Sequence, residues 1–177
     1  MAKSWTADLA ASFGFLTRLP IPGALPRAPL PEAMRAFPLA GAIIGAASGL
    51  VLAGLASTGL PGLAASGLAL SALALLTGGL HEDGLADTAD GFGGGRDRDS
   101  KLAIMRDIEI GAYGTCALIL SFMLRAGALV SLAEPGLVAP ALIAAHAGAR
   151  ATLPTFMRLV PNARRDGLSA GVGTPPQ

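Results

Sequence analysis

The chain has 177 residues, of which 52% are hydrophobic and only 14% are charged. Soluble domains carry about 25% charged residues, so this composition is typical of a protein that contacts lipid over much of its surface. Its hydrophobicity excludes intrinsic disorder, its single cysteine excludes a disulfide scaffold, and its formal net charge of +1 gives no electrostatic reason for binding nucleic acid.

The first predicted element is a short helix at the N-terminal end. Its apolar residues recur at helical spacing: Trp5, Leu9, Phe13 and Leu16. This stripe is typical of a helix that lies in the membrane interface, and equally of a first helix that packs on the core. Five prolines in residues 20–31 then predict an irregular connector.

A long uncharged stretch follows the connector. The 46 residues before Glu82 contain no Asp, Glu, Lys or Arg, whereas a helix needs about 20 apolar residues to cross a bilayer. Because Pro61-Gly62 is a turn signal near the middle, we expect one span at 37–59 and a second at 63–80. The competing interpretation, a buried helical hairpin of a soluble protein, does not need so long an uncharged stretch.

Three glycines of the first predicted span, Gly41, Gly45 and Gly49, fall on one helix face. Small residues at every fourth position let membrane helices approach closely. We therefore expect this face to pack against another helix rather than to carry chemistry.

Two further spans are expected after residue 109. The third covers 110–132, or ends nearer Leu124, because Arg125 is costly in lipid and usually snorkels or faces a polar cavity. The fourth covers 136–149, or continues to 160, and its prolines predict a kinked or partly interfacial helix. The sequence therefore predicts an all-α, polytopic membrane helical bundle of about four spans, forming one integral-membrane domain over residues 1–177.

Basic residues are expected to set the orientation of the spans. They precede the first span and follow the second and the fourth, whereas the turns at 61–62 and 133–136 contain no Lys or Arg. All basic clusters then lie on one side, which we expect to be the cytoplasm. The acidic segment after the second span lies on the same side.

That segment, at about 81–109, is expected to form an acidic, Gly-rich active-site loop. It holds eight of the chain's twelve acids within 28 residues: Glu82, Asp83, Asp87, Asp90, Asp97, Asp99, Asp107 and Glu109. Asp83, Asp87 and Asp90 have spacings of four and three, which on a helix would place their carboxylates on one face. They would repel one another without a cation, so the pattern favours a cation site over a solvated loop of mixed charge.

Mg²⁺ is the expected cation, because it prefers oxygen ligands and is typically held by one or two carboxylates plus substrate phosphates. Zinc is less favoured, since His81 is the only nearby nitrogen ligand. Neighbouring glycines would let backbone N–H groups cradle phosphate: Gly91, Gly93, Gly94 and Gly95. Neighbouring cations would hold phosphate oxygens: Arg96, Arg98, Lys101 and Arg106.

The same segment resembles a known family. Residues 81–95 (HEDGLADTADGFGGG), 104–107 (IMRD) and 111–114 (GAYG) closely resemble cobalamin synthase, the adenosylcobinamide-GDP ribazoletransferase family. Further segments that match the family are 15–22, 37–41 and 165–168. Family members are usually longer, with additional hydrophobic helices, so we expect this chain to be a truncated or naturally short form.

The resemblance implies a Mg²⁺-dependent, multi-pass enzyme of the inner membrane. It would transfer the phosphate-bearing adenosylcobinamide group of adenosylcobinamide-GDP to α-ribazole, or to α-ribazole 5′-phosphate, and release GMP in the last step of cobalamin assembly. The implied partners are these two substrates and the lipid bilayer, with no nucleic acid, and a homo-oligomer is compatible with the sequence.

The resemblance also carries residue roles onto this chain. The metal ligands would be Glu82, Asp83, Asp87 and Asp90. Beyond the resemblance, our mechanistic hypothesis is that Asp87 or Asp90 accepts the proton of the attacking hydroxyl, with His81 as the next candidate base. The substrate-binding residues would be Gly93, Gly94, Gly95, Arg96, Lys101, Arg106 and Asp107.

Two other function classes stay open. A CDP-alcohol phosphotransferase also uses an Asp-x-x-Asp-Gly element, here residues 87–91, but the Ala-Arg and paired acids that usually follow it are missing. A cation transporter should carry its acids near the bilayer midplane, whereas these acids cluster after a span.

Overall fold

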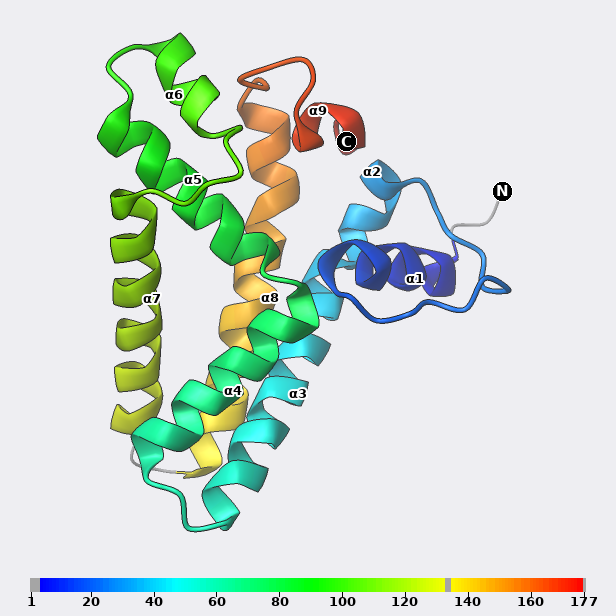
Figure 1. Cartoon of the computed structure of the whole chain (residues 1–177). Helices are drawn as coiled ribbons and strands as arrows, with labels where there is room; N and C mark the ends of the chain where they lie inside the picture. The colour runs from blue at the N-terminus through cyan, green and yellow to red at the C-terminus, as the bar shows by residue number, and fades with distance from the viewer. Residues whose placement is uncertain (1–3, 133–134, 177) are drawn as a thin grey trace. The chain divides into compact units, whose positions relative to one another are not determined.

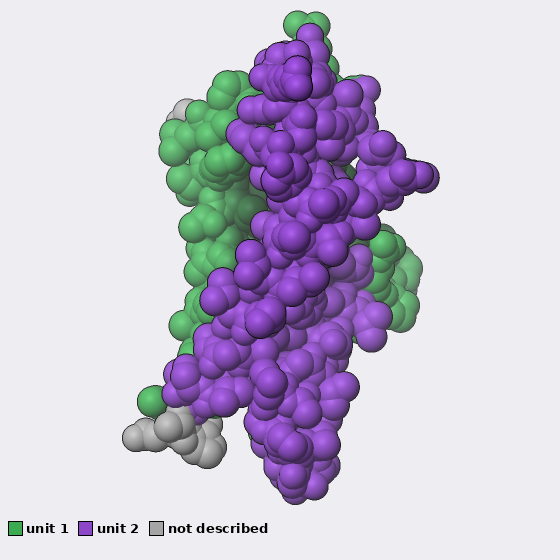
Figure 2. All heavy atoms as spheres, turned by 60° about the vertical axis from the view of Figure 1, so that its left-hand side comes forward, with its two compact units in different colours: residues 1–53, 134–177 green, residues 54–133 purple. Residues whose placement is uncertain are grey.

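The computed structural model describes residues 4–132 and 135–176, and the regular structure in these ranges is helical without a strand (Figure 1). This confirms the predicted all-α class. Contacts divide the chain into two compact units (Figure 2), which we call unit 1 (residues 1–53 and 134–177) and unit 2 (residues 54–133). That the whole chain inserts into the membrane as one domain stays a prediction.

Within the described residues, three helical stretches are long and apolar enough to cross a membrane: Leu30–Ser57, Ala112–Ser131 and Gly136–Leu159. A fourth candidate is a pair of helices, Gly62–Thr77 and Leu80–Gly94, that is bent by 94° and forms either a broken span or a re-entrant loop. These lengths confirm the prediction of a polytopic helical membrane protein with about four spans.

Unit 1 begins with a helix that packs through polar and small residues. Its helices are α1 (Trp5–Leu16), α2 (Leu30–Ala33), the 3-10 turn η1 (Met34–Ala36), α3 (Phe37–Ser57), α8 (Pro135–Leu159) and α9 (Leu168–Val172). Asp8 of α1 is buried and accepts a 2.7 Å hydrogen bond from Arg35 Nε. Of the predicted apolar stripe on α1 only Leu16 is buried, and Trp5 is exposed. The buried contacts of α1 are therefore made mostly by residues outside the predicted stripe, and a position in the membrane interface stays a prediction.

The predicted glycine face of α3 lies against α8. A Cβ at Gly45 would lie 2.5 Å from the carbonyl oxygen of Leu142, and one at Gly49 would lie 3.2 Å from Ala139 Cα. A Cβ at Gly41 would meet the carbonyl oxygen of α8 residue 146. The face is therefore a close packing surface, as predicted, and only glycine permits this approach of the two backbones.

The predicted span ends are confirmed to within a few residues, with two exceptions. α8 continues through Pro140 and Pro154 to Leu159, so the shorter alternative ending at 149 is wrong. In unit 2, α7 continues past Arg125 to Ser131, so the alternative ending near Leu124 is also wrong. Arg125 is tolerated there because it has a charged partner within unit 2.

Unit 2 consists of α4 (Gly62–Thr77), α5 (Leu80–Gly94), α6 (Arg98–Ile104) and α7 (Ala112–Ser131). Gly78 and Gly79 both adopt left-handed backbone conformations, with φ of 67° and 69°. Such conformations favour glycine and end helices. They stop α4 three residues before the predicted end of the second span and turn the chain by 94° into α5.

The segment at 81–109 is mostly helical, which corrects the prediction of a loop. It forms α5 and α6, joined by a short connection. Helix-interior glycines usually cost about 1 kcal/mol each, which is why their density suggested a loop. Here Gly91, Gly93 and Gly94 lie where α5 meets its neighbours, whereas Gly84 has open space beside it. The acids Glu82 and Asp83 occupy the first turn of α5, where the helix dipole favours negative charge.

Candidate active site

The acidic helix α5 contacts α7 along one stripe, which we call the α7-facing stripe and define as Glu82, Ala86, Asp90 and Gly93. Ala86 and Asp90 are buried, and Asp90 is only 8% exposed. The spacings of four, four and three residues keep these positions on one side of a helix. In Figure 1, α5 crosses unit 2 and ends beside the N-terminal end of α7.

Asp90 accepts hydrogen bonds from the backbone at the start of α7. The N–H of Gly111 donates to Oδ2 at 2.8 Å, and the N–H of Gly114 donates to Oδ1 at 2.9 Å. The first N–H groups of a helix have no partner within the helix, and a carboxylate there is also favoured by the helix dipole. Asp90 therefore caps α7 from a different helix.

Both glycines at the start of α7 make room for this cap. A Cβ at Gly111 or at Gly114 would collide with the Asp90 carboxylate, and a Cβ at Gly114 would also lie 3.0 Å from the carbonyl oxygen of Ala86. The segment 111–114, which carries part of the family resemblance, is thus shaped around the carboxylate of Asp90.

Glu82, at the other end of the stripe, pairs with the arginine inside α7. Arg125 Nη1 donates to Glu82 Oε1 at 3.1 Å, while Arg125 Nε donates to the carbonyl of Ser121 at 3.2 Å and its guanidinium lies 4.6 Å from the centroid of the Phe122 ring. The Glu82 side chain is 15% exposed. Its other oxygen, Oε2, is buried and has no hydrogen-bond partner in the described part of the chain.

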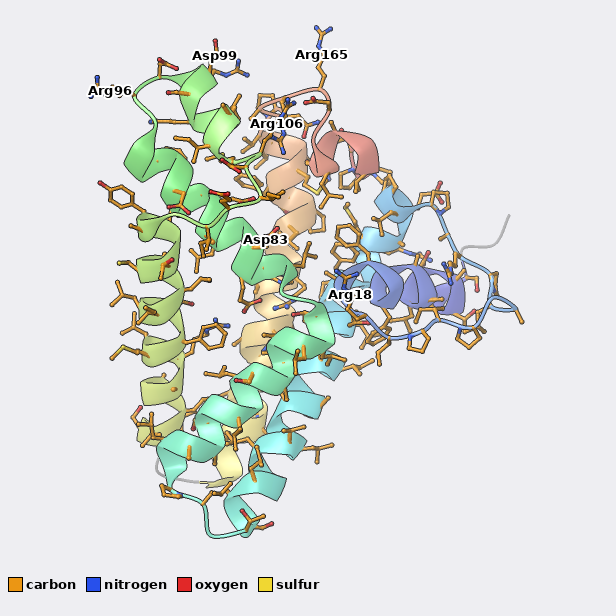
Figure 3. All side chains as sticks on the ribbon, in the orientation of Figure 1. Arg18, Asp83, Arg96, Asp99, Arg106 and Arg165 are labelled. Carbon is orange, nitrogen blue, oxygen red and sulfur yellow. The ribbon has the colours of Figure 1, made fainter. Side chains whose placement is uncertain are left out.

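The remaining predicted metal ligands and the predicted histidine base lie away from this stripe. Asp83 is exposed in the first turn of α5 (Figure 3), Asp87 follows four residues later and is half-buried, and His81 is exposed. In the ranges that the structure describes, no three His, Cys, Asp or Glu side chains converge as a ready-made metal group.

The donor chemistry of α5 nevertheless fits Mg²⁺. This ion needs only one or two protein carboxylates when substrate phosphates and water complete its coordination. Asp83 and Asp87 are separated by one helical turn, so they share a face. Glu82 Oε2, which is buried without a hydrogen-bond partner among the described residues, belongs to the same turn as Asp83. Asp90 fits less well, since both of its oxygens already accept amide hydrogen bonds.

The predicted phosphate-cradling glycines lie against neighbouring helices. A Cβ at Gly93 would collide with the ring of Tyr113, and one at Gly94 would lie 3.2 Å from Ile104 Cδ1. A Cβ at Gly95, the C-cap of α5, would meet the backbone N of Lys101 at 2.7 Å. Close packing is therefore sufficient to explain these glycines, and contact with phosphate stays a prediction.

The predicted cationic residues lie around α6. Lys101 Nζ lies 4.6 Å from the centroid of the Phe92 ring. Arg96 and Arg106 are exposed (Figure 3). Asp107 is also exposed and accepts a 3.3 Å hydrogen bond from the N–H of Glu109. The structure therefore gathers these residues on the α5–α6–α7 side of unit 2 without placing them around one point.

α6 begins at Arg98, directly after a side chain that caps it. Its N-cap is Asp97, whose Oδ1 accepts a 2.8 Å bond from the N–H of Ser100 while the Ser100 hydroxyl bonds back to the Asp97 backbone. The hydrogen bonds from Ser100 lower the pKa of Asp97 below its ordinary value, because they stabilise the charged carboxylate.

Sequence reasoning missed Arg125, Gly111 and Gly114 as parts of this site. The sequence indicates that Arg125 snorkels or faces a polar cavity, but it does not identify Glu82 as the acidic partner. Gly111 and Gly114 were noticed only as part of the family resemblance, because a residue that leaves space for a distant side chain has no local signature.

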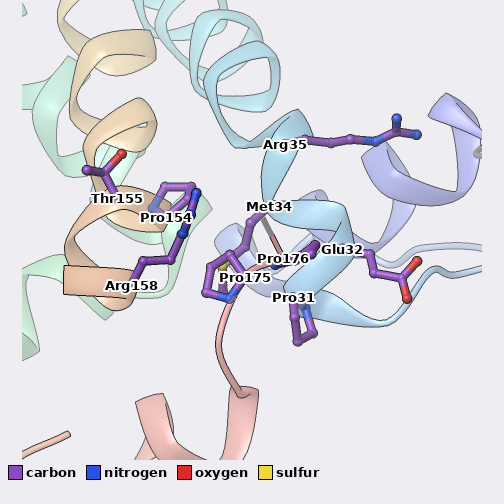
Figure 4. A pocket seen from close by; sticks show the side chains of 9 residues that line it. All are labelled: Pro31, Glu32, Met34, Arg35, Pro154, Thr155, Arg158, Pro175 and Pro176. Atoms are coloured by element: carbon purple, nitrogen blue, oxygen red, sulfur yellow. The ribbon is translucent and has the colours of Figure 1, made fainter. Parts of the chain in front are cut away.

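Unit 1 contains a cavity of about 250 Å³ (Figure 4). It is lined by Pro31, Glu32, Met34, Arg35, Pro154, Thr155, Arg158, Pro175 and Pro176. None of the residues predicted for the active site lines this cavity, so the cavity gives no support to the predicted acidic site.

Comparison with known proteins gives one consistent family. The family model described as Cobalamin-5-phosphate synthase matches residues 8–175. Relatives named adenosylcobinamide-GDP ribazoletransferase come from Bradyrhizobium diazoefficiens, with 55% identity over 96% of this chain and 66% of the relative, and from Mesorhizobium japonicum, with 49% identity over 94% and 64%. A third, from Azorhizobium caulinodans, is 48% identical over 96% of this chain and 67% of the relative.

The chain spans just under two thirds of the length of the first two of these relatives. No solved structure matches the chain.

Proposed function

Because the chain belongs to the cobalamin-5-phosphate synthase family, we propose that it acts as an adenosylcobinamide-GDP ribazoletransferase in the last step of cobalamin assembly. A ribose hydroxyl oxygen of α-ribazole, or of α-ribazole 5′-phosphate, attacks the phosphorus nearest cobinamide. The new P–O bond replaces the bond to the leaving GMP, and the hydroxyl proton passes to a base. The observation that carries this proposal is the family match over 8–175, which includes the whole acidic helix α5.

We propose Mg²⁺ as the cofactor. Asp83 and Asp87 would hold it, with Glu82 Oε2 as a third protein oxygen, and the ion would neutralise charge on the diphosphate of adenosylcobinamide-GDP. The support is the pair of carboxylates one helical turn apart and the buried oxygen of Glu82 that has no partner among the described residues.

Protein side chains supply the remaining tasks. Asp87 is the preferred base, because the Asp90 oxygens already accept amide hydrogen bonds, and exposed His81 is the alternative. Arg96, Lys101 and Arg106 would bind oxygens of the diphosphate, and Asp107 would contact the substrate from the connection between α6 and α7. Positioning and electrostatic stabilisation account for most of the catalysis of phosphoryl transfer.

The site is proposed to face the cytoplasm from the inner membrane. The connection between α5 and α7 carries the basic residues Arg96, Arg98, Lys101 and Arg106, and such residues are enriched on the cytoplasmic side of membrane proteins. Single cysteines at 96–107, in a variant without Cys116, should react with an impermeant thiol reagent from the cytoplasmic side only. Labelling from the opposite side would contradict this orientation.

The decisive assay incubates the protein in lipid nanodiscs with adenosylcobinamide-GDP and α-ribazole and measures GMP. GMP should appear only when both substrates and Mg²⁺ are present, and chelation by EDTA should stop the reaction. Asp99→Asn is a matched control, since Asp99 is an exposed acid of α6 outside the proposed site. GMP release without α-ribazole, or transfer from a CDP-alcohol instead, would contradict the proposal.

A further inference from the structure

Two acids of α5 are held by groups of α7. Glu82 and Asp90 belong to the α7-facing stripe, where one pairs with Arg125 and the other with the first amides of α7. Asp83 and Asp87 each follow directly after a residue of that stripe. Asp83 is exposed and Asp87 is half-buried, whereas Asp90 is buried against the start of α7.

From this geometry we infer that Asp90 and Arg125 are positioning residues rather than residues that touch metal or substrate. They fasten α5 to α7 at two places, separated by eight residues along α5, or about 12 Å at 1.5 Å per residue. Two separate attachments along one helix restrain its rotation as well as its position. The role of Asp83 and Asp87 in this inference rests on the proposed function. The attachment of α5 to α7 does not depend on that function.

The hydrogen-bond donors and the free space around the Asp90 side chain match a carboxylate. Each carboxylate oxygen receives its own N–H donor, and Gly111 and Gly114 lack the Cβ that would occupy the carboxylate's place. An amide side chain of the same shape offers only one acceptor oxygen, so Asp90→Asn would leave one amide of α7 facing an NH₂ group. A metal ligand would not need these two glycines.

The attachment at Arg125 fixes Glu82 in a particular orientation. Arg125 is held in turn by the carbonyl of Ser121 and the ring of Phe122, so its guanidinium has a defined direction. It binds only Oε1 of Glu82, and Oε2 stays buried without a partner in the described part of the chain. Arg125 thereby directs the second oxygen of Glu82 while remaining outside the reaction itself.

The test uses the whole chain in lipid nanodiscs and three measurements. The first is hydrogen exchange of the peptide covering 108–116. The second is the dissociation constant of Mn²⁺, a paramagnetic probe for the proposed Mg²⁺ site, followed by electron paramagnetic resonance. The third is the kcat and KM of GMP release. The variants are Asp90→Asn, Gly114→Ala, Asp87→Asn, Arg125→Gln and Arg125→Lys, with Asp99→Asn as the control.

Asp90→Asn and Gly114→Ala should both accelerate exchange of the 108–116 peptide about tenfold, although Gly114→Ala leaves every acid in place. Asp87→Asn should leave this exchange unchanged and weaken Mn²⁺ binding about tenfold or more. Arg125→Gln should lower kcat about tenfold with little change in KM, and Arg125→Lys should restore most of that loss, because the amine keeps the charge beside Glu82.

The inference about Asp90 is wrong if Asp90→Asn weakens Mn²⁺ binding as strongly as Asp87→Asn and leaves the exchange of 108–116 unchanged. It is wrong about Arg125 if Arg125→Gln keeps the original kcat, or if Arg125→Lys is as impaired as Arg125→Gln. Failure of the unaltered protein to bind Mn²⁺ or to release GMP would instead contradict the proposed function. Hydrogen exchange would then still decide whether Asp90 caps α7.

Discussion

Two helix contacts in this protein use glycine in opposite ways. In unit 1, the glycine face of α3 lets the backbone of α8 approach until carbonyl oxygens fill the places of the missing side chains. In unit 2, Gly111 and Gly114 leave space that the charged carboxylate of Asp90 fills. The first contact only holds two apolar helices together, whereas the second places a charge at a helix end beside the proposed active site.

The comparison teaches that glycine density alone does not identify a ligand-binding backbone. The glycines at the C-terminal end of α5 were expected to cradle phosphate, yet each of Gly93, Gly94 and Gly95 lies close to a side chain or backbone of a neighbouring helix. What separates the two contacts is the group that occupies the space beside the glycine. Substitutions that restore a Cβ therefore test each contact directly.

The largest effect is expected from Asp87→Asn, which removes a carboxylate that is proposed as the base and as a metal ligand in unit 2. Loss of a general base typically costs 10²–10⁴-fold in rate, so turnover should fall about 10³-fold, equivalent to about 4 kcal/mol in activation free energy. A near-normal rate at saturating Mg²⁺ would refute a role for Asp87 as base or as metal ligand.

Gly45→Ala should be more destabilising than Gly93→Ala, Gly54→Ala or Gly84→Ala. Its Cβ would lie 2.5 Å from a backbone oxygen of α8, and backbone cannot rotate away as a side chain can, so we expect a loss of about 3 kcal/mol in the free energy of unfolding. The measurement is thermal unfolding in nanodiscs.

Gly54→Ala is the matched control for that substitution, since Gly54 lies in the same helix and no described heavy atom lies within 4 Å of its Cβ position. It should be neutral or stabilising by up to about 1 kcal/mol, because alanine is the better helix former. Equal unfolding temperatures for Gly45→Ala and Gly54→Ala would refute the α3–α8 contact.

A smaller effect is expected for Gly93→Ala in unit 2. Its Cβ would collide with the ring of Tyr113, but Tyr113 is 58% exposed and its ring can turn aside, so the loss should be about 1 kcal/mol. Gly84→Ala is its control, because no described atom lies within 4 Å of that position in the same helix. A large loss of stability in Gly84→Ala would contradict the packing assigned to α5.

The smallest effect is expected at the start of α6. The pKa of Asp97 is lowered by hydrogen bonds from Ser100, so the folded state favours the charged carboxylate. The resulting stabilisation is fully present above the ordinary pKa of Asp97, and it is lost as the pH falls through the lowered value. The protection factors of the amides of residues 98–104 should fall below that pH in the unaltered protein, and Asp97→Asn should remove this dependence. An unchanged pH profile in Asp97→Asn would contradict the capping assignment.

Much of the fold was predictable because its signals are local. Uncharged length and the Pro61-Gly62 turn predicted α3 and α4 to within a few residues, and the glycine face of α3 was recognised from its spacing alone. The helical state of α5 was not predicted, since Asp and Gly are poor helix formers. Its helix depends on contacts with α6 and α7, which no local pattern encodes.

The contacts of the candidate site are likewise not encoded in any local sequence pattern. The acids of α5 were identified from their types and spacing. The different environments of Asp90 and Asp87 could not be predicted, because both are aspartates and their spacing places them on one helix face. Arg125 lies 43 residues after its partner Glu82, and an ion pair over that distance in the chain can be recognised only when both helices are placed.

By itself, the sequence determined that this is a helical membrane protein of the cobalamin-5-phosphate synthase family with a concentrated acidic segment. Hydropathy, charge and helical period are properties of neighbouring residues, so they can be determined without knowledge of the fold. Only the tertiary structure decided which carboxylates face α7 and which glycines make room for them. That choice depends on the crossing of α5 and α7, where burial makes an unpaired charge or an extra Cβ costly.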